Sequence, residues 1–192
     1  DSDPIVIAGG CCMLNPAPMT DFIDVFFLVE MDSALVPAME ALDALREKGA
    51  SRREQLELLN SYPFTYVPRI EPDKKAKREI FKEFSSSTAN TAPLVPMMPA
   101  VQDRVVVEFS RGCTNGCLFC QAGIIYRLLR EKGVANLCNL SLDLINQTGY
   151  QEVSLLCLDS VDYSLIAPLL VSLADVMTER KVSLALPSLR AE

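Results

Sequence analysis

The chain has 192 residues, of which 49% are hydrophobic and 22% are charged, proportions that exclude a mostly disordered protein. It carries 18 Lys and Arg against 25 Asp and Glu, and this net charge of −7 argues against binding nucleic acid through overall charge. Histidine is absent, which excludes Ser-His-Asp hydrolysis, Cys-His proteolysis and His-ligated metals. No apolar run approaches the length of about 20 residues that a membrane span needs, so no membrane partner is expected.

Residues 1–70 follow an α/β pattern. Two short apolar runs predict buried strands, and the first ends in the pair Gly9-Gly10. Apolar residues then recur at three- and four-residue steps, which predicts an amphipathic helix. Ser51 and Glu54 form a capping box that opens a further helix. The predicted elements are strands over 5–8 and 24–29 and helices over 33–48 and 51–59.

Residues 71–100 differ in composition, because a cluster of Lys and Arg is followed by three serines and three prolines. This stretch is predicted to be a linker or an extended arm. A second α/β pattern fills residues 101–192, and its alternation of strands with helices predicts parallel pairing. Gly133 is expected to end the first of its helices. The predicted elements are strands over 105–109, 153–158 and 182–186 and helices over 122–132 and 163–178.

Three cysteines follow the first strand of this second pattern. Cys113, Cys117 and Cys120 form a C-x3-C-x2-C run, in which Gly112 and Gly116 allow the loop to fold tightly. Three local thiolates suit a 4Fe-4S cluster that keeps one iron open. A zinc site usually has paired C-x2-C knuckles or histidine, a ferredoxin-like carrier needs a fourth nearby cysteine, and uncoordinated core cysteines at this density are the third alternative.

The other four cysteines, Cys11, Cys12, Cys138 and Cys157, lie in apolar segments or at their edges. They are predicted to be small buried hydrophobic residues. With seven cysteines a complete disulfide set is impossible, and the crowding of three of them favours metal binding in a reducing compartment. The sequence is therefore interpreted as that of a soluble, cytoplasmic protein.

The C-x3-C-x2-C run, with Phe119 before its last cysteine, resembles the radical S-adenosylmethionine (SAM) superfamily. With residues 111–127, 152–156 and 183–190, the chain is similar to uncharacterised radical SAM proteins that carry an N-terminal cobalamin-binding domain. The resemblance implies a partial (β/α) barrel over 101–192. It implies that the C-terminal part of a Rossmann-like cobalamin-binding domain precedes it over 1–70. Since such a barrel needs about six strands, the chain is expected to be a fragment of a longer enzyme.

The resemblance implies that Cys113, Cys117 and Cys120 bind a 4Fe-4S cluster, which reductively cleaves SAM to a 5′-deoxyadenosyl radical. An external donor such as a flavodoxin or ferredoxin would supply the electron. The SAM-binding candidates are Phe119, Asp159, Ser160, Asp162, Ser188 and Arg190. Asp162 could instead cap a helix starting at Tyr163, and Ser188 and Arg190 could be simple surface positions.

The family resemblance leaves the later reaction open. A cobalamin partner domain suggests methyl transfer, while looser similarity to methylthiotransferases suggests modification of tRNA. Val29-Glu30-Met31-Asp32 stands where relatives carry a Gly-Glu-Gly-Glu type loop, and the loss of two glycines argues against cobalamin binding. The rival hypotheses are a non-catalytic iron-sulfur or zinc protein and a truncated pseudoenzyme that keeps the triad but lacks half of the barrel.

Overall fold

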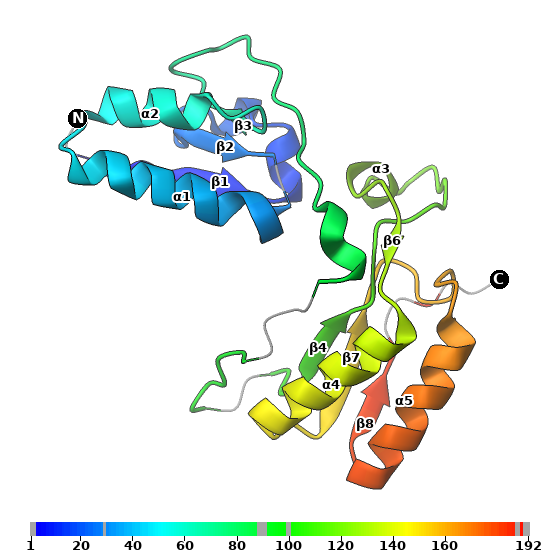
Figure 1. Cartoon of the computed structure of the whole chain (residues 1–192). Helices are drawn as coiled ribbons and strands as arrows, with labels where there is room; N and C mark the ends of the chain where they lie inside the picture. The colour runs from blue at the N-terminus through cyan, green and yellow to red at the C-terminus, as the bar shows by residue number, and fades with distance from the viewer. Residues whose placement is uncertain (1–2, 29, 88–91, 99–100, 187–188, 190–192) are drawn as a thin grey trace. The chain divides into compact units, whose positions relative to one another are not determined.

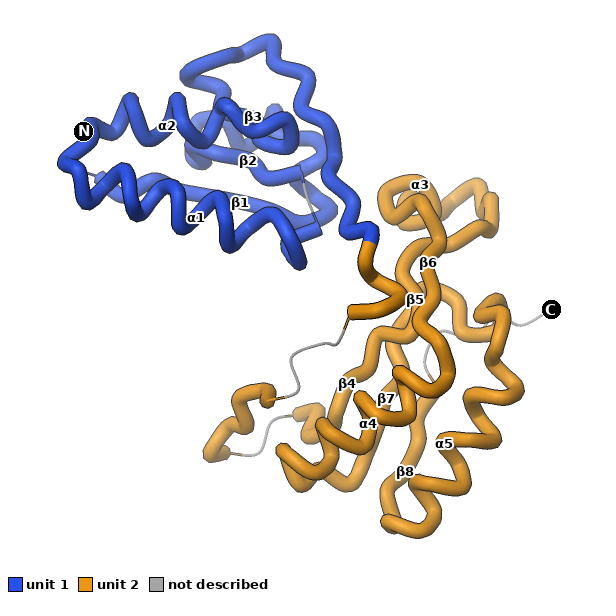
Figure 2. The backbone as a smooth tube through the Cα atoms, viewed as in Figure 1, with its two compact units in different colours: residues 1–82 blue, residues 83–192 orange. Residues whose placement is uncertain are grey.

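The computed structural model describes residues 3–28, 30–87, 92–98, 101–186 and 189. The chain divides into two compact units, Asp1–Lys82 and Glu83–Glu192 (Figure 2). The predicted boundaries at residues 70 and 100 stay predictions. No described helix is both long enough and apolar enough to cross a membrane.

Unit 1 contains a three-stranded sheet in the order β1-β2-β3 (Figure 1). Strand β2 lies in the middle, parallel to β1 with Val25 opposite Ile7, and antiparallel to β3 with Phe27 opposite Thr65. All three residues of β2 are buried, as the continuous apolar run predicted. The elements are β1 (Ile7–Gly9), η1 (Cys11–Leu14), η2 (Ala17–Met19), β2 (Val25–Phe27), α1 (Met31–Glu47), α2 (Arg52–Asn60) and β3 (Thr65–Tyr66).

Helices α1 and α2 contribute to one core with β2. The predicted capping box at the start of α2 is confirmed: Ser51 Oγ accepts a hydrogen bond from the Glu54 N–H, and the Glu54 carboxylate accepts one from the Ser51 N–H at 2.7 Å. The hydrogen bonds that the Ser51 hydroxyl and the Ser51 N–H donate to the Glu54 carboxylate lower the pKa of Glu54. The buried core residues of this unit are Val25, Phe27, Ala38, Leu42, Leu56, Leu59, Phe64 and Val67.

Unit 2 contains a parallel sheet in the order β4-β7-β8 and a separate two-stranded ribbon of β5 and β6. The parallel pairing predicted from the alternation of strands and helices is confirmed. A single turn, η3 (Lys82–Ser85), lies at the boundary of the units. The remaining elements are β4 (Val105–Glu108), β5 (Ser110–Arg111), α3 (Ala122–Ile125), β6 (Arg130–Glu131), α4 (Val134–Thr148), β7 (Glu152–Leu156), α5 (Ile166–Arg180) and β8 (Ser183–Ala185).

Helices α4 and α5 cover the same face of this sheet, because side chains of both share a core with Val105, Val107 and Leu155 (Figure 1). On the opposite face Val106 and Leu156 are about half exposed. The described strands therefore form a small open parallel sheet covered on one side. The α/β class is confirmed, and no closed barrel is seen in the described part of the chain.

The predicted helix over 122–132 is wrong for most of its length. Helix α3 ends at Ile125, and residues 130–131 instead form β6, which pairs with β5. Gly133 does not end a helix. It is the extended N-cap residue of α4, which the sequence interpretation missed, although Leu137, Leu140 and Leu144 recur at helical steps.

Candidate functional site

The cysteine loop, residues 112–121, begins where the β5–β6 ribbon opens. Ser110 pairs with Glu131 and Arg111 pairs with Arg130, so the ribbon closes the base of the segment that contains the cysteine loop. Gly112 has φ of 99°, and a Cβ there would lie 2.6 Å from the Leu128 carbonyl oxygen. Only glycine fits this position, because both the backbone angle and the space exclude a side chain.

The three cysteines of the loop are half-buried, and none is in a disulfide. The Asn115 N–H donates to Cys113 Sγ at 3.4 Å, and the Cys120 N–H donates to the Cys117 carbonyl oxygen at 3.0 Å. Among the described residues, no group of three Cys, Asp or Glu side chains is gathered closely enough to hold a metal ion. The predicted donors thus share one accessible loop without forming a closed site.

Asn115 joins the cysteine loop to the loop that follows β7. Its side-chain Nδ2 donates to Asp159 Oδ2 at 3.0 Å and to Asp162 Oδ2 at 2.5 Å. Both loops leave the carboxyl ends of neighbouring parallel strands, where α/β sheets place their ligand sites. The structure therefore brings two of the predicted SAM-binding residues beside the cysteine loop, through an asparagine that the sequence interpretation did not single out.

The two aspartates are oriented by backbone as well as by Asn115. Asp159 Oδ1 accepts a hydrogen bond from the Val161 N–H at 3.2 Å. Asp162 is exposed and does not cap a helix at Tyr163, because α5 begins three residues later, at Ile166. The helix-cap alternative for Asp162 is therefore wrong, and its carboxylate is held at the loop-to-loop contact.

Ser160 lies in a different environment from its two acidic neighbours. Its side chain is fully buried, and its Oγ lies 3.4 Å from Cys157 Sγ. Burial raises the pKa of the Cys157 thiol, as expected for a core cysteine. Ser160 thus packs beneath the site, whereas Asp159 and Asp162 lie at its surface.

Phe119 and its neighbour Leu118 project from the cysteine loop into solvent, with Phe119 92% exposed. An aromatic ring this exposed is available for stacking on a flat ligand. The other two SAM candidates, Ser188 and Arg190, lie outside the described residues.

A buried lysine and a charged pair support the base of the loop. Lys132 is 3% exposed, and its Nζ donates to the carbonyl oxygens of Phe84 and Ser87 at 3.0 and 2.6 Å. Arg111 makes two hydrogen bonds to Glu108, at 2.9 and 2.7 Å, and its guanidinium lies over the Phe84 ring. The sequence around Lys132 does not indicate its partners, because Phe84 and Ser87 lie 48 and 45 residues away along the chain.

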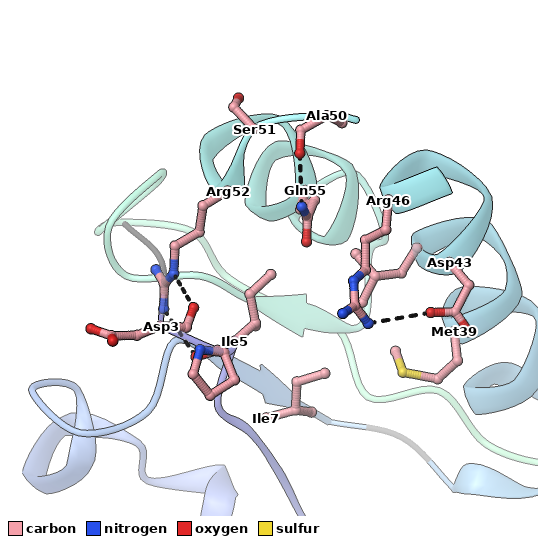
Figure 3. A pocket seen from close by; sticks show the side chains of 12 residues that line it. Asp3, Ile5, Ile7, Met39, Asp43, Arg46, Ala50, Ser51, Arg52 and Gln55 are labelled. Carbon is pink, nitrogen blue, oxygen red and sulfur yellow. Dashed lines mark hydrogen bonds and ion pairs between the residues drawn. The ribbon is translucent and has the colours of Figure 1, made fainter. Parts of the chain in front are cut away.

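Unit 1 carries its own cleft, of about 800 Å3, between the strand β1 and the helices α1 and α2 (Figure 3). Ile5, Ile7 and Met39 give it an apolar floor. Three of its charged side chains contact other residues: Arg46 pairs with Asp43 at 3.5 Å, and Arg52 donates to the Asp3 carbonyl oxygen. None of the predicted site residues lines this cleft.

Residues 1–68 match the model of a family described as radical SAM proteins, N-terminal. The matched stretch covers 68 of the 192 residues. A comparison with curated proteins gave no match. The matched stretch includes β1 to β3 and both helices of unit 1, and the description of the family does not mention cobalamin.

Radical SAM proteins generally use an iron-sulfur cluster and SAM, and the side chains of this chain match both groups chemically. Three thiols on one loop match the chemistry of such a cluster, which thiolates bind. The exposed Phe119 ring and two surface carboxylates match the chemistry of SAM, which has an adenine ring and an amino group. The residue types therefore fit these two groups, but the three cysteine sulfurs would have to move closer together to bind one cluster.

Proposed function

We propose that this chain is part of a radical SAM enzyme whose site lies at the carboxyl ends of β4 and β7. The observation that carries the proposal is the contact of Asn115, inside the C-x3-C-x2-C loop, with Asp159 and Asp162 of the next loop. The family match over residues 1–68 supports it independently, because it comes from the other unit.

In this proposal Cys113, Cys117 and Cys120 hold a 4Fe-4S cluster. When bound, such a cluster supplies the electron that cleaves SAM reductively, and a flavodoxin or ferredoxin would deliver that electron. The loop is suited to wrapping a compact group, because Gly112 and Gly116 bear no side chains and the β5–β6 ribbon anchors its base.

The remaining residues position SAM. Asp159 and Asp162 present carboxylate oxygens that can accept hydrogen bonds from an ammonium group, and Asn115 fixes where those oxygens lie. Phe119 offers a ring face for the adenine. The half-barrel implied by the resemblance agrees with a sheet covered on one face only, since the open face would then line the barrel interior.

We propose no role for cobalamin. In the described part of the segment that follows β2, Glu30 is the N-cap residue of α1 and accepts a hydrogen bond from Arg78 at 2.7 Å. The Phe81 N–H also donates to this carboxylate, which is 9% exposed. The segment is thus fixed within unit 1 by a buried ion pair, whereas close approach of a corrin would need glycine backbone there.

The test is anaerobic reconstitution with iron and sulfide, followed by electron paramagnetic resonance of the reduced protein with and without SAM. We expect a reduced 4Fe-4S signal that changes when SAM is added, and formation of 5′-deoxyadenosine. Cys117→Ala should abolish both, whereas Cys138→Ala, which changes a cysteine packed against the core, should leave both intact.

Three outcomes would contradict the proposal. Zinc in place of iron would indicate a structural metal site, and a cluster whose signal ignores SAM would indicate an electron carrier. A cluster that binds SAM without producing 5′-deoxyadenosine under reducing conditions would indicate a pseudoenzyme.

A further inference from the structure

Cys11 and Cys12 are not in the core, contrary to the prediction from their apolar surroundings. Both are exposed on the single turn η1, which follows β1 directly, and neither is in a disulfide. Their Sγ atoms lie 4.0 Å apart. The first unit thus presents two adjacent thiols at its surface, and neither has a role in the proposed SAM chemistry.

The geometry of this pair disfavours a disulfide. Cα atoms of adjacent residues lie about 3.8 Å apart across a trans peptide, whereas disulfides usually join Cα atoms separated by about 4.4 to 6.8 Å. A bond between Cys11 and Cys12 would therefore be strained and easily reduced. This leaves the two sulfurs available together as thiols.

The same separation suits chelation of a metal. In a tetrahedral site with metal–sulfur bonds of about 2.3 Å, two sulfur ligands lie about 3.8 Å apart. The observed 4.0 Å between the Cys11 and Cys12 sulfurs is close to this value. Little rearrangement is then needed to bring both sulfurs onto one ion, and such preorganisation lowers the entropic cost of binding.

We propose that Cys11 and Cys12 form a two-thiolate binding site for a thiophilic metal ion, with small external ligands completing the coordination. Thiolates favour soft and borderline ions such as Cu+, Zn2+ and Cd2+ over Mg2+ and Ca2+. The site belongs to unit 1, and it does not depend on the proposed function of the cysteine loop.

The backbone of η1 fixes the pair. The Met13 N–H donates to the Gly10 carbonyl oxygen at 3.1 Å, and the Asn15 N–H donates to the Cys12 carbonyl oxygen at 3.4 Å. Gly10 has φ of 99°, so the chain turns sharply out of β1, and apart from its two chain neighbours no described residue has an atom within 4 Å of where its Cβ would be. The two thiols therefore stand on a defined turn with open space beside it.

The two thiols already interact. Cysteine binds a metal ion as the thiolate, so each of the two thiols must lose its proton when the ion binds. Binding should therefore release protons and strengthen as the pH rises.

The experiment uses the full chain with Cys113, Cys117 and Cys120 replaced by Ala, so that the triad cannot bind metal. Cd2+ is titrated in, and binding is followed by the ultraviolet thiolate-to-metal charge-transfer absorption. We expect one Cd2+ per chain, and an affinity that falls about 100-fold when either thiol is removed by Cys11→Ser or Cys12→Ser, because one anchoring ligand then remains. Cys138→Ser in the same background is the matched control and should bind as before.

A second measurement uses a monosubstituted trivalent arsenical oxide, which condenses with two neighbouring thiols and releases one water. Mass spectrometry should find one adduct, on the peptide that contains Cys11 and Cys12, and neither single Ser variant should form it. The proposal is overturned if Cd2+ binds to both Ser variants as tightly as to the parent chain, or if the adduct forms elsewhere. Both serine changes lie at exposed positions, and circular dichroism checks that the variants fold.

Discussion

Both units are built from short strands and helices, but they use charged residues in opposite ways. In unit 1, carboxylates are buried against arginines: Asp24 pairs with Arg52 at 2.7 Å and Glu30 pairs with Arg78 at 2.7 Å, with both carboxyl side chains less than a tenth exposed. In unit 2, Asp159 and Asp162 lie at the carboxyl ends of the strands, where an amide gathers them. The first arrangement fixes backbone segments, and the second leaves carboxylate oxygens available to a ligand.

The sheets of the two units also differ in strand direction. Strand β3 runs antiparallel to β2 in unit 1, whereas β4, β7 and β8 are all parallel. A fully parallel sheet collects the carboxyl ends of its strands on one edge, so its loops converge there. Under the proposed function, the second unit therefore carries the site for SAM chemistry, whereas buried ion pairs stabilise the first. Variants in each unit test this difference.

The largest effect is expected at the buried ion pair of unit 1. Arg52→Met leaves the Asp24 carboxylate buried without its main cation, which should cost about 3 kcal/mol or more in the free energy of unfolding. Arg53→Met is the matched control, because its exposed pair with Glu57 contributes about 0.5 kcal/mol or less. Denaturant unfolding combined with hydrogen exchange of β2 measures both. Equal effects of the two variants would show that burial does not set the strength of this pair.

The same pair makes unit 1 sensitive to acid. Burial alone would raise the pKa of Asp24, but hydrogen bonds from the Val6 N–H and Arg52, with the charges of Arg52 and Arg69, outweigh it and lower the pKa. The stability that Asp24 contributes is therefore present above its ordinary pKa of about 4 and is lost as the pH falls through the native value. Asp24→Asn should be less stable than the native chain at pH 7, and the difference should shrink in acid. Hydrogen exchange of β2 at several pH values tests this, and a constant difference would refute it.

Lys132 provides the corresponding test in unit 2. Lys132→Met removes a buried cation whose Nζ donates to two carbonyl oxygens and to Ser87 Oγ, so residues 84–87 lose their anchor. We expect a loss of about 2–3 kcal/mol in the free energy of unfolding. Ser87→Ala removes only the hydroxyl acceptor and should cost about 1 kcal/mol. If Lys132→Met is neutral in denaturant unfolding, buried charge is not a stabilising feature of this unit.

The loop-to-loop contact gives a smaller effect that is specific to function. Asn115→Asp places a third carboxylate against Asp159 and Asp162, and the repulsion should separate the loops. Under the proposed function, SAM should bind about tenfold more weakly, a change of about 1.4 kcal/mol, while cluster loading stays unchanged. Thr114→Ala, at an exposed position of the same loop, is the control. Loss of the cluster itself in Asn115→Asp would mean that this residue supports the metal site and not SAM.

The smallest effect separates backbone conformation from packing in unit 2. Gly149 ends α4 with φ of 73°, and Gly133 begins it with φ of −72°. Apart from chain neighbours, no described residue has an atom within 4 Å of either Cβ position. Gly149→Ala should therefore cost about 1 kcal/mol, because only the left-handed backbone penalises the added carbon. Gly133→Ala should be neutral within about 0.5 kcal/mol. Thermal unfolding compares them, and equal changes would contradict the assignment.

Features that depend on a few neighbouring residues were predictable from the sequence. The apolar run at β2 and the capping box at Ser51 follow from local patterns of hydrophobicity and hydrogen-bonding side chains. The parallel direction of the strands in unit 2 follows from their alternation with helices. The spacing of the cysteine triad likewise predicts a cluster ligand set, which stays a prediction. Each of these signals is a pattern along the chain, so it can be recognised without knowledge of tertiary contacts.

Features that depend on partners far along the chain were missed. Residues 130–131 were predicted to continue the helix that begins at Ala122. They instead pair with β5 and close the base of the cysteine loop. Cys11 and Cys12 look like core residues because Ile5 and Ile7 precede them, but the turn at Gly10 takes them to the surface. In each case a tertiary contact or a sharp turn overrides the local preference.

The sequence by itself therefore determined the α/β character and the strands that form the centres of the sheets, because both follow from the spacing of apolar residues. It also predicts a thiol set for a cluster. Only the tertiary structure decided that Asn115 would bring Asp159 and Asp162 to the cysteine loop and that Ser160 would be buried beneath them. Residues 44 and 47 positions apart meet there because parallel pairing of β4 with β7 aligns the ends of both strands. Spacing along the chain carries no record of that alignment.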